Sequence, residues 1–229
     1  MIKGVFVIEQ FTEDNLKKAL ELGANTIFTG YKNLDSSLYR ELQEKGISIF
    51  AEIGLFAGDN LWEKYPDSRP IDSNGNLMDK EKWYAGVCPN HPGVRCEKLG
   101  EIERIVAEES IDGIWLDFIR YPVHWEVHEP NLNEYCYCET CLSKFRADTN
   151  LNHPREDKKI WRDWKCRQIT EFVADVRNII VGSRRDLKLG LFAVPWKTSD
   201  FDGAIRKIVG QDFRSLSKYV DIFSPMTYH

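Results

Sequence analysis

Three cysteines lie within six residues, in the run Cys136-Tyr-Cys138-Glu-Thr-Cys141. A turn with this spacing brings three sulfur atoms to one point and leaves the fourth position of a tetrahedral zinc site to another residue. The alternatives are free thiols or a disulfide framework, and the latter is rare in a chain without a secretory signal. An iron–sulfur cluster is disfavoured, because the usual cysteine spacings differ from this one.

The fourth ligand must come from Cys88, Cys96 or Cys166. Cys166 lies inside a predicted helix, where it is expected to pack, and Cys96 lies in the first turn of another. Cys88 lies in a loop on the same side of the predicted sheet as the cysteine run. Because four thiolates leave no position for a reactive water, we expect a structural zinc site. Its predicted ligands are Cys88, Cys136, Cys138 and Cys141.

Asp117 interrupts the apolar run Ile114-Trp-Leu-Asp-Phe-Ile119, which predicts a strand. An unpaired charge is costly in such a strand, and a carboxylate at the C-terminal end of a barrel strand is typical of an active site. A structural pair with Arg120 is the alternative, although their spacing in an extended chain puts the two side chains on opposite faces. We predict that Asp117 is catalytic, as a nucleophile or as the carboxylate that stabilises an oxocarbenium-like transition state.

A reaction through an oxocarbenium-like transition state uses a second carboxyl group, and three glutamates are candidates. Glu126 is predicted to follow the same strand, and its neighbour Trp125 would favour the protonated form of an acid. Glu52 interrupts the preceding strand and is equally expected as a partner inside a barrel, whereas Glu9 ends the first strand. Arg120 is expected to pair with a catalytic carboxylate or to hold a substrate hydroxyl.

Aromatic side chains cluster at the same predicted strand ends, and flat rings with polar tips suit stacking on sugar faces. Ordinary packing is the alternative for each ring taken alone. The predicted substrate-binding residues are Tyr121 and Trp125 after the fourth strand, Trp196 after the fifth, and Tyr228 and His229 after the sixth.

Two segments resemble known families. The run Cys88-Pro-Asn-His-Pro-Gly-Val-Arg95, with the cysteine run that follows it, resembles the zinc site of family 42 β-galactosidases, which are TIM-barrel enzymes. The strand Asp112-Gly-Ile-Trp-Leu-Asp117 resembles more closely the uncharacterised glycoside-hydrolase-like barrels that share an Asp-Gly-Ile-x-x-Asp motif in strand four. These resemblances imply a TIM barrel, a zinc site made by the four cysteines, and a sugar substrate.

The chain also departs from these families. Family 42 enzymes end strand four with Asn-Glu, whose Glu is the acid, whereas no Glu adjoins Asp117. Their nucleophile comes from strand seven, which is missing from the predicted elements, and a chitinase-type Asp-x-Asp-x-Glu motif is also absent. The resemblance therefore implies the zinc site and the barrel, but not β-galactosidase activity.

The elements that position these residues alternate between amphipathic helices and short apolar strands. Helical spacing of apolar residues and β-rich apolar runs distinguish the two kinds. Strands are expected at 4–8, 26–29, 47–51, 114–119, 187–194 and 221–226, and helices at 13–22, 36–45, 94–109, 160–181 and 212–219. This pattern predicts an α/β fold of the (β/α)8 TIM-barrel type, with long loops 55–92 and 123–159 at the C-terminal end of the strands.

A single domain over residues 1–229 is expected, because α/β barrels of about 200–250 residues are common as undivided domains. About six βα units are two short of a closed barrel. We therefore expect an incomplete barrel whose catalytic set extends beyond these residues, and the alternative is an open, doubly wound sheet.

Composition narrows the class of protein. A net charge of −5 argues against a nucleic-acid partner, and no apolar stretch approaches the roughly 18 residues of a membrane span. The start of the chain shows no secretory signal, which favours a cytoplasmic protein. A homo-oligomer remains open.

We expect an O-glycosyl hydrolase that cleaves a poly- or oligosaccharide by a two-carboxylate mechanism. The alternative is a non-catalytic, zinc-stabilised barrel that binds carbohydrate or is purely structural. A metal-dependent hydrolase is disfavoured, because catalytic zinc keeps an open ligand position.

Overall fold

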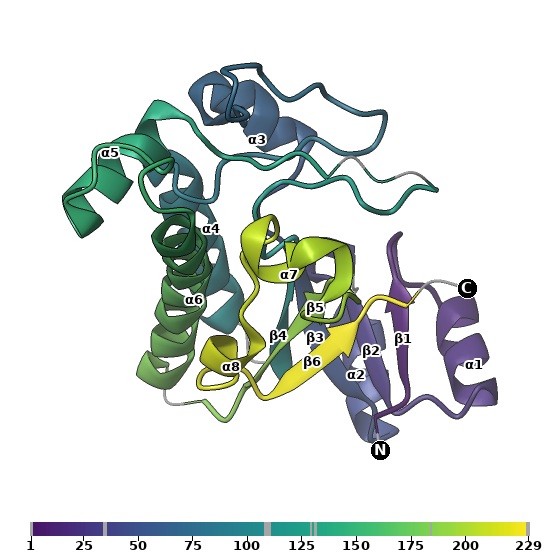
Figure 1. Ribbon diagram of the computed structural model, residues 1–229. Coiled ribbons are helices and arrows are strands. Elements are labelled where there is room, and N and C mark those ends of the chain that lie inside the picture. The colour runs from purple at the N-terminus through teal and green to yellow at the C-terminus, as the bar shows by residue number, and fades with distance from the viewer. Residues whose placement is uncertain are drawn as a thin grey trace.

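Six parallel strands form a curled sheet with helices around its outer face (Figure 1). The strands are β1 (Gly4–Val7), β2 (Thr26–Gly30), β3 (Ser48–Gly54), β4 (Gly113–Asp117), β5 (Lys188–Ala193) and β6 (Ile222–Pro225). The computed structural model describes residues 2–33, 36–107, 111–128, 130, 132–183 and 185–227.

The strand order in the sheet is the same as the order along the chain. A doubly wound sheet would reverse direction at an internal switch point, so that alternative is wrong. The predicted α/β fold is confirmed as an incomplete (β/α) barrel, in which six strands make a curled half-barrel.

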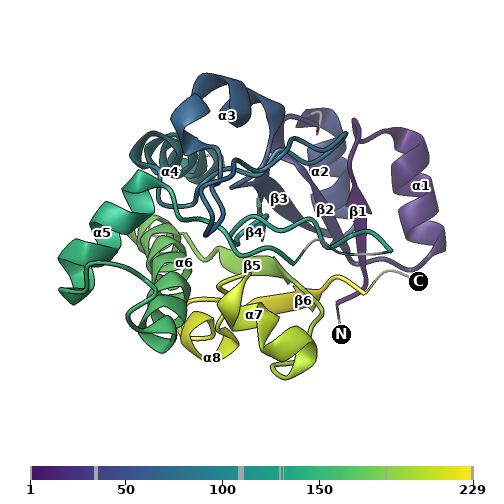
Figure 2. The same cartoon turned by 45° about the horizontal axis from the view of Figure 1, so that its top comes forward.

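Helices α1, α2, α4 and α6 lie around the outside of the sheet in both ribbon views (Figure 2). Gly23 and Gly46 follow α1 and α2 with φ of +67° and +68°, a conformation that favours glycine at a helix end. The helices are α1 (Glu13–Glu21), α2 (Ser36–Glu44), α3 (Asp59–Lys64), α4 (Pro92–Ala107), α5 (Glu139–Thr149), α6 (Lys158–Gly182), α7 (Ala204–Lys207) and α8 (Phe213–Leu216). The five predicted helices correspond to α1, α2, α4, α6 and a shorter α8.

Aromatic rings fill the concave face of the sheet. Phe28, Phe50 and Trp115 come from adjacent strands β2, β3 and β4, and their ring centroids lie 4.4–5.7 Å apart. Phe6 of β1 contacts Phe192 of β5 edge to face, with centroids 5.4 Å apart. Because three strands separate β1 from β5, this contact requires a strongly curled sheet.

Glycines on the same face make room for these rings. A Cβ atom at Gly190 of β5 would overlap the ring of Trp115, and one at Gly113 of β4 would overlap Phe50. A Cβ atom at Gly4 of β1 would likewise overlap the ring of Phe28 of β2. Large side chains on one strand therefore fit against glycine on the next, as the tight interior of a small barrel requires.

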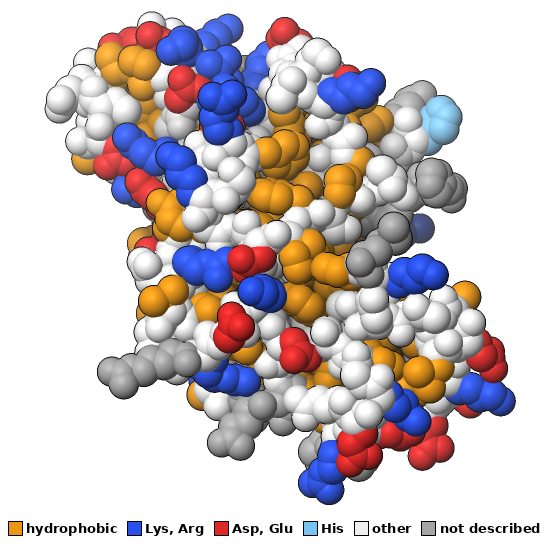
Figure 3. All heavy atoms as spheres, turned by 90° about the horizontal axis from the view of Figure 1, so that it is seen from below, with side chains coloured by type: hydrophobic (Ala, Val, Ile, Leu, Met, Phe, Trp, Pro, Cys, Tyr) orange, Lys and Arg blue, Asp and Glu red, His pale blue; other side chains and the backbone are white. Residues whose placement is uncertain are grey.

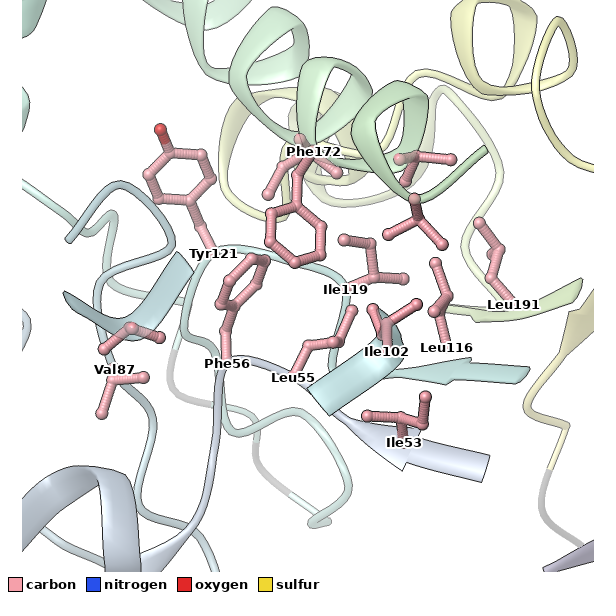
Figure 4. Close-up of a cluster of buried hydrophobic side chains, with 14 of the residues drawn as sticks. Ile53, Leu55, Phe56, Val87, Ile102, Leu116, Ile119, Tyr121, Phe172 and Leu191 are labelled. Atoms are coloured by element: carbon pink, nitrogen blue, oxygen red, sulfur yellow. The ribbon is translucent and has the colours of Figure 1, made fainter. Parts of the chain in front are cut away.

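The convex face carries the main core, between the sheet and α4 and α6 (Figure 4). Ile53 of β3 and Leu116 of β4 point outward toward Ile102 of α4. Phe172 of α6 packs edge to face against Phe56, which follows β3, with centroids 5.0 Å apart. Losing such a buried ring typically costs about 3–5 kcal/mol, so α6 holds the connection after β3 in place.

The two long segments predicted as polar loops contain α3 and α5. They pack on each other, because Asp72 and Tyr135 form an antiparallel bridge and the Arg155 guanidinium donates to the Ser73 carbonyl at 2.9 Å. Both follow strands and lie beyond the C-terminal ends of the sheet, as predicted.

Hydrophobic side chains also reach the surface on the underside. In the view from below they form a band through the middle of the molecule, with charged side chains around it (Figure 3). None of the described helices combines the length and apolar character that crossing a bilayer demands.

Replacing one interior glycine tests the packing of the barrel. We expect Gly190→Ala to destabilise the fold by at least about 1–3 kcal/mol, because the added methyl group displaces the Trp115 ring. Gly100→Ala in α4 is the matched control: its Cβ meets nothing within 4 Å, and helix propensity predicts a gain of about 0.5–1 kcal/mol. Denaturant unfolding of both variants measures the difference, and equal stabilities would contradict this account of the concave face.

Candidate functional site

Two carboxylates lie on neighbouring strands of the concave face. The register pairs Gly54 of β3 with Asp117 of β4, and Glu52 precedes Gly54 by two residues. Since alternate residues of a strand share a face, Glu52 and Asp117 point to the same side, the side that also carries Trp115. Both lie in the last residues of their strands, at the end where barrel enzymes place their active sites.

Burial favours the protonated forms of both acids. Burial, followed by the charge of Asp117, raises the pKa of Glu52 to about 7. Burial also raises the pKa of Asp117, against the opposing effect of the Arg120 charge and of a hydrogen bond from the Phe118 N–H. Two carboxyl groups that differ in their neighbouring charges are suited to different roles in acid–base chemistry.

A strained residue fixes the Asp117 carboxylate. Phe118 has a φ of +50°, which is unusual for a residue with a bulky side chain. Its N–H donates to Oδ1 of Asp117 at 2.6 Å. Strain of this kind persists only where the surroundings enforce it and is common at functional sites.

Arg120 and Glu126 form a buried ion pair beside this carboxylate. Nη2 of Arg120 lies 2.8 Å from Oε1 of Glu126, and the Arg120 side chain is only 2% exposed. The other Glu126 oxygen accepts the Trp125 N–H at 3.2 Å. Arg120 also lies over the Phe118 ring at 5.0 Å. Its ion-pair partner is thus Glu126 rather than Asp117.

The predicted sugar-binding aromatics have different surroundings. Trp125 and Trp196 pack edge to face with centroids 6.1 Å apart, and Trp196 lies partly exposed against Phe201. Tyr121 is fully buried, so its ring offers no face to a sugar. Tyr228 and His229 lie outside the described residues.

Sequence reasoning did not select His124 as a site residue. Its ring stacks on Tyr84 with a centroid distance of 5.6 Å and an interplanar angle of 16°. Trp83, which is 55% exposed, meets the His124 ring edge to face. Within the described residues the buried Nε2 of His124 has no hydrogen-bond partner. The only sequence signal was its place between Asp117 and Trp125.

The four predicted cysteines converge on one point. The sulfur atoms of Cys88, Cys136, Cys138 and Cys141 all lie within 4.8 Å of one another and are buried. Sγ of Cys88 lies 3.4 Å from that of Cys141 and 3.5 Å from that of Cys138. A disulfide requires about 2.05 Å, whereas thiolates around tetrahedral zinc at about 2.3 Å lie roughly 3.8 Å apart. The arrangement fits a metal ion and not a disulfide.

The surroundings of the cluster also suit thiolate sulfur. Nδ2 of Asn90 donates to Sγ of Cys141 at 3.3 Å and to the Tyr121 hydroxyl at 2.8 Å. Burial raises the pKa of the Cys88 and Cys141 thiols, so a bound cation is needed to keep four sulfurs ionised together.

The remaining cysteines lie elsewhere, as predicted. Cys96 is exposed on α4, and Cys166 is buried within α6, where its Sγ donates to the Arg206 carbonyl at 3.5 Å. The choice of Cys88 over these two residues is confirmed by the geometry.

Solved structures share this fold. The glycoside hydrolase domain of PgaB (BpsB) from Bordetella bronchiseptica superposes with a TM-score of 0.66 at 13% identity, covering 99% of this chain and 74% of that one. A β-galactosidase from the psychrophilic Marinomonas ef1 gives 0.70 at 12% identity, over 100% and 41% of the two chains. An α-L-fucosidase from Paenibacillus thiaminolyticus gives 0.62 at 19% identity, over 89% and 34%. The chain spans less than half the length of these last two enzymes, and such identities establish the fold alone.

Sequence comparisons assign the family. A comparison with curated protein sequences finds no match. A family model described as "Putative glycosyl hydrolase domain" matches residues 10–229, which is nearly the whole chain. The predicted resemblance to glycoside-hydrolase-like barrels is thereby confirmed, and the chain belongs to this glycosyl hydrolase domain family.

Proposed function

We propose that this protein hydrolyses a glycosidic bond of a poly- or oligosaccharide with Asp117 and Glu52 as its two carboxylates. The observation that carries the proposal is their placement on one face of neighbouring strands, at the C-terminal end of a glycosyl-hydrolase-type barrel. Glycoside hydrolysis requires one carboxyl group that gives a proton to the leaving oxygen and a second, ionised one.

The mechanism needs one protonated and one ionised carboxyl group, and the two acids are suited to these different states. Glu52 is the acid that keeps its proton near neutral pH, because burial and the charge of Asp117 raise its pKa to about 7. We assign Asp117 as the ionised partner: burial raises its pKa, and the Arg120 charge and the hydrogen bond from the Phe118 N–H oppose that rise. It acts as the nucleophile or stabilises the oxocarbenium-like transition state.

Glu126, one of the three candidates that the sequence offered for the second carboxylate, has a different environment. Its Oε1 lies 2.8 Å from Nη2 of the buried Arg120 guanidinium, in an ion pair. We assign this pair to holding the loop after β4, with Arg120 as a positioning residue for Asp117. Trp196, which is partly exposed on the connection after β5 and packs on the buried Trp125, is the proposed sugar-contacting ring.

We further propose that the four cysteines hold one structural Zn²⁺ ion. Four sulfur ligands complete a tetrahedral shell, and zinc prefers this donor set. When bound, the ion would link Cys88 of the connection after β3 to three cysteines of the connection after β4. It would therefore fix the two long segments that surround the carboxylates.

The carboxylates are tested by amide substitution. We expect Asp117→Asn and Glu52→Gln each to lower kcat/KM by about 10²–10⁴-fold, because each removes an ionisable group from the reaction. Reducing-end release from a panel of poly- and oligosaccharides measures this, and Glu103→Gln on the exposed face of α4 is the matched control.

Glu126→Gln distinguishes the two assignments of the second carboxylate. Breaking a buried ion pair costs about 3–5 kcal/mol, so this variant should melt earlier yet keep kcat. Loss of turnover in Glu126→Gln with full activity in Glu52→Gln would identify Glu126 as the second carboxylate. Full activity in Asp117→Asn would contradict the catalytic proposal and favour a non-catalytic carbohydrate-binding barrel.

The raised pKa of Glu52 predicts a pH-dependent stability. Between its ordinary value of 4.5 and about 7, Glu52 is protonated in the folded state and ionised in the unfolded state. The folded state then binds more protons, so stability falls as pH rises through this window, by about 3 kcal/mol in all. Glu52→Gln removes this loss. Unfolding free energies of variant and wild type should diverge by that amount between about pH 4 and about pH 8, and a constant difference would contradict the burial of this carboxyl group.

Metal content tests the zinc proposal. We expect about one equivalent of zinc in the purified wild type, and loss of zinc with a lower Tm in Cys136→Ser, because structural zinc contributes folding free energy directly. Cys96→Ser, which alters an exposed thiol outside the cluster, should keep both. A wild type with less than about half an equivalent and an unchanged Tm after chelation would exclude the site.

A further inference from the structure

A cavity lies among the long connections that follow β3, β4 and β5, and neither Glu52 nor Asp117 lines it. It has a volume of about 810 Å³, within the roughly 300–1,000 Å³ range of ligand pockets. Three consecutive βα connections line it: Ser73 from the one after β3, residues between Glu134 and Arg162 from the one after β4, and residues between Thr198 and Lys207 from the one after β5. It therefore opens at the same end of the sheet as Asp117.

The lining is strongly cationic, although the whole chain carries a net charge of −5. Two of the lining residues are acidic, Glu134 and Asp202, whereas six carry a positive charge. The six are Arg155, Lys158, Lys159, Arg162, Arg206 and Lys207. The two signs are therefore distributed unevenly over the molecule, with an excess of positive charge around this cavity.

The carboxylates near the cavity leave this charge undercompensated. Glu134 is already engaged by the buried ammonium of Lys165, at 2.7 Å. Asp163 faces three cations, with nitrogen–oxygen distances of 3.0 Å to Arg162, 3.2 Å to Arg206 and 3.7 Å to Lys159. Arg206 also lies 3.6 Å from Asp212, and Lys207 pairs with Asp202 at 2.9 Å.

Two of the cations have no carboxylate partner among the described residues. Across the described part of the chain, no carboxylate lies within ion-pair distance of exposed Lys158. Arg155, also exposed, donates to the carbonyl of Ser73 rather than to a carboxylate.

Two aromatic side chains line the cavity between these charged residues. Tyr137 and Trp161 line the cavity and pack on each other with centroids 5.2 Å apart, and the Trp161 indole N–H is engaged by Glu134 at 2.9 Å. A cavity with arginine forks along a partly apolar wall suits planar carboxylates carried on apolar ring faces.

We infer that this cavity binds an acidic polysaccharide, a chain of sugar rings bearing carboxylates, as an extension of the substrate site. The inference rests on the proposed function and names the substrate class for it. Positive charges that are spread over three connections match a polymer with repeated negative charges better than a single anion. The cavity opens at the same end of the sheet as Asp117, so that one polysaccharide chain can reach both the cavity and the concave face.

Binding measurements test this without requiring turnover. An α-1,4-linked oligogalacturonate and a neutral maltooligosaccharide of equal length are titrated by calorimetry into the full chain carrying Asp117→Asn. We expect the oligogalacturonate alone to bind, with an affinity that falls as salt rises. Lys158→Glu with Lys159→Glu should weaken it about tenfold or more. Both changes lie in the first turn of α6, where acidic residues favour the helix.

The matched control is Lys17→Glu with Lys32→Glu, which makes the same change in net charge on exposed residues of α1 and of the turn after β2. It should leave the affinity unchanged. Equal binding of the neutral oligomer, equal effects of both double variants, full competition by inorganic phosphate, or tighter binding of single-stranded DNA would each overturn the inference. Hydrolysis of neutral glycans without oligogalacturonate binding would overturn this inference alone, whereas binding without any glycan hydrolysis by the wild type would overturn the proposed function alone.

Discussion

The fit of aromatic rings over glycines on the concave face is the constraint on which the rest of the structure depends. Trp115 occupies the space that a side chain at Gly190 would need, and Phe50 does the same at Gly113. Strands joined in this way approach closely and curl, so that Phe6 of the first strand meets Phe192 of the fifth. The curl brings the C-terminal ends of the strands together, and only then do Glu52 and Asp117 share one small, poorly solvated space.

That burial explains why the pKa of both carboxyl groups is raised. On a flat sheet open to water, neighbouring acids would be screened and both would ionise. Here burial disfavours the charge on both, and the charge of Asp117 adds to the effect on Glu52. Arg120 cannot neutralise the pair fully, because its ion-pair partner is Glu126. The same packing that stabilises the barrel therefore raises the pKa of both acids, which have different neighbouring charges.

The sequence predicted the regular part of the fold well and the site only in part. All six strands and the helices of the outer layer follow from local periodicity, which alternates faces along a strand and recurs along a helix. The choice of Cys88 also succeeded, because placement at the C-terminal end of the sheet limits which thiols can meet. Tyr121 shows the limit of such reasoning: its position after a catalytic-type strand suggested sugar contact, yet a hydrogen bond from Asn90 and the nearby cysteines hold it in the core. The pairing of Arg120 with Glu126, and the cavity beside α6, depend on how two long connections fold on each other, and no local pattern encodes that.

The long connections carry both a cluster of cysteine sulfurs and a group of positively charged side chains, with little regular structure between the two. The cysteine cluster and the bridge between Asp72 and Tyr135 tie the connections after β3 and β4 together on the side that faces the core. Their outer surface carries the cations that converge beside α6. A rim that is rigid on its inner side can hold like charges close together, because their repulsion would otherwise push flexible loops apart. A cation bound by four thiolates would thus do more than stabilise the fold. It would fix the residues between Glu134 and Arg162 relative to Ser73, and so hold the positive charges around the cavity close together in a molecule whose net charge is negative.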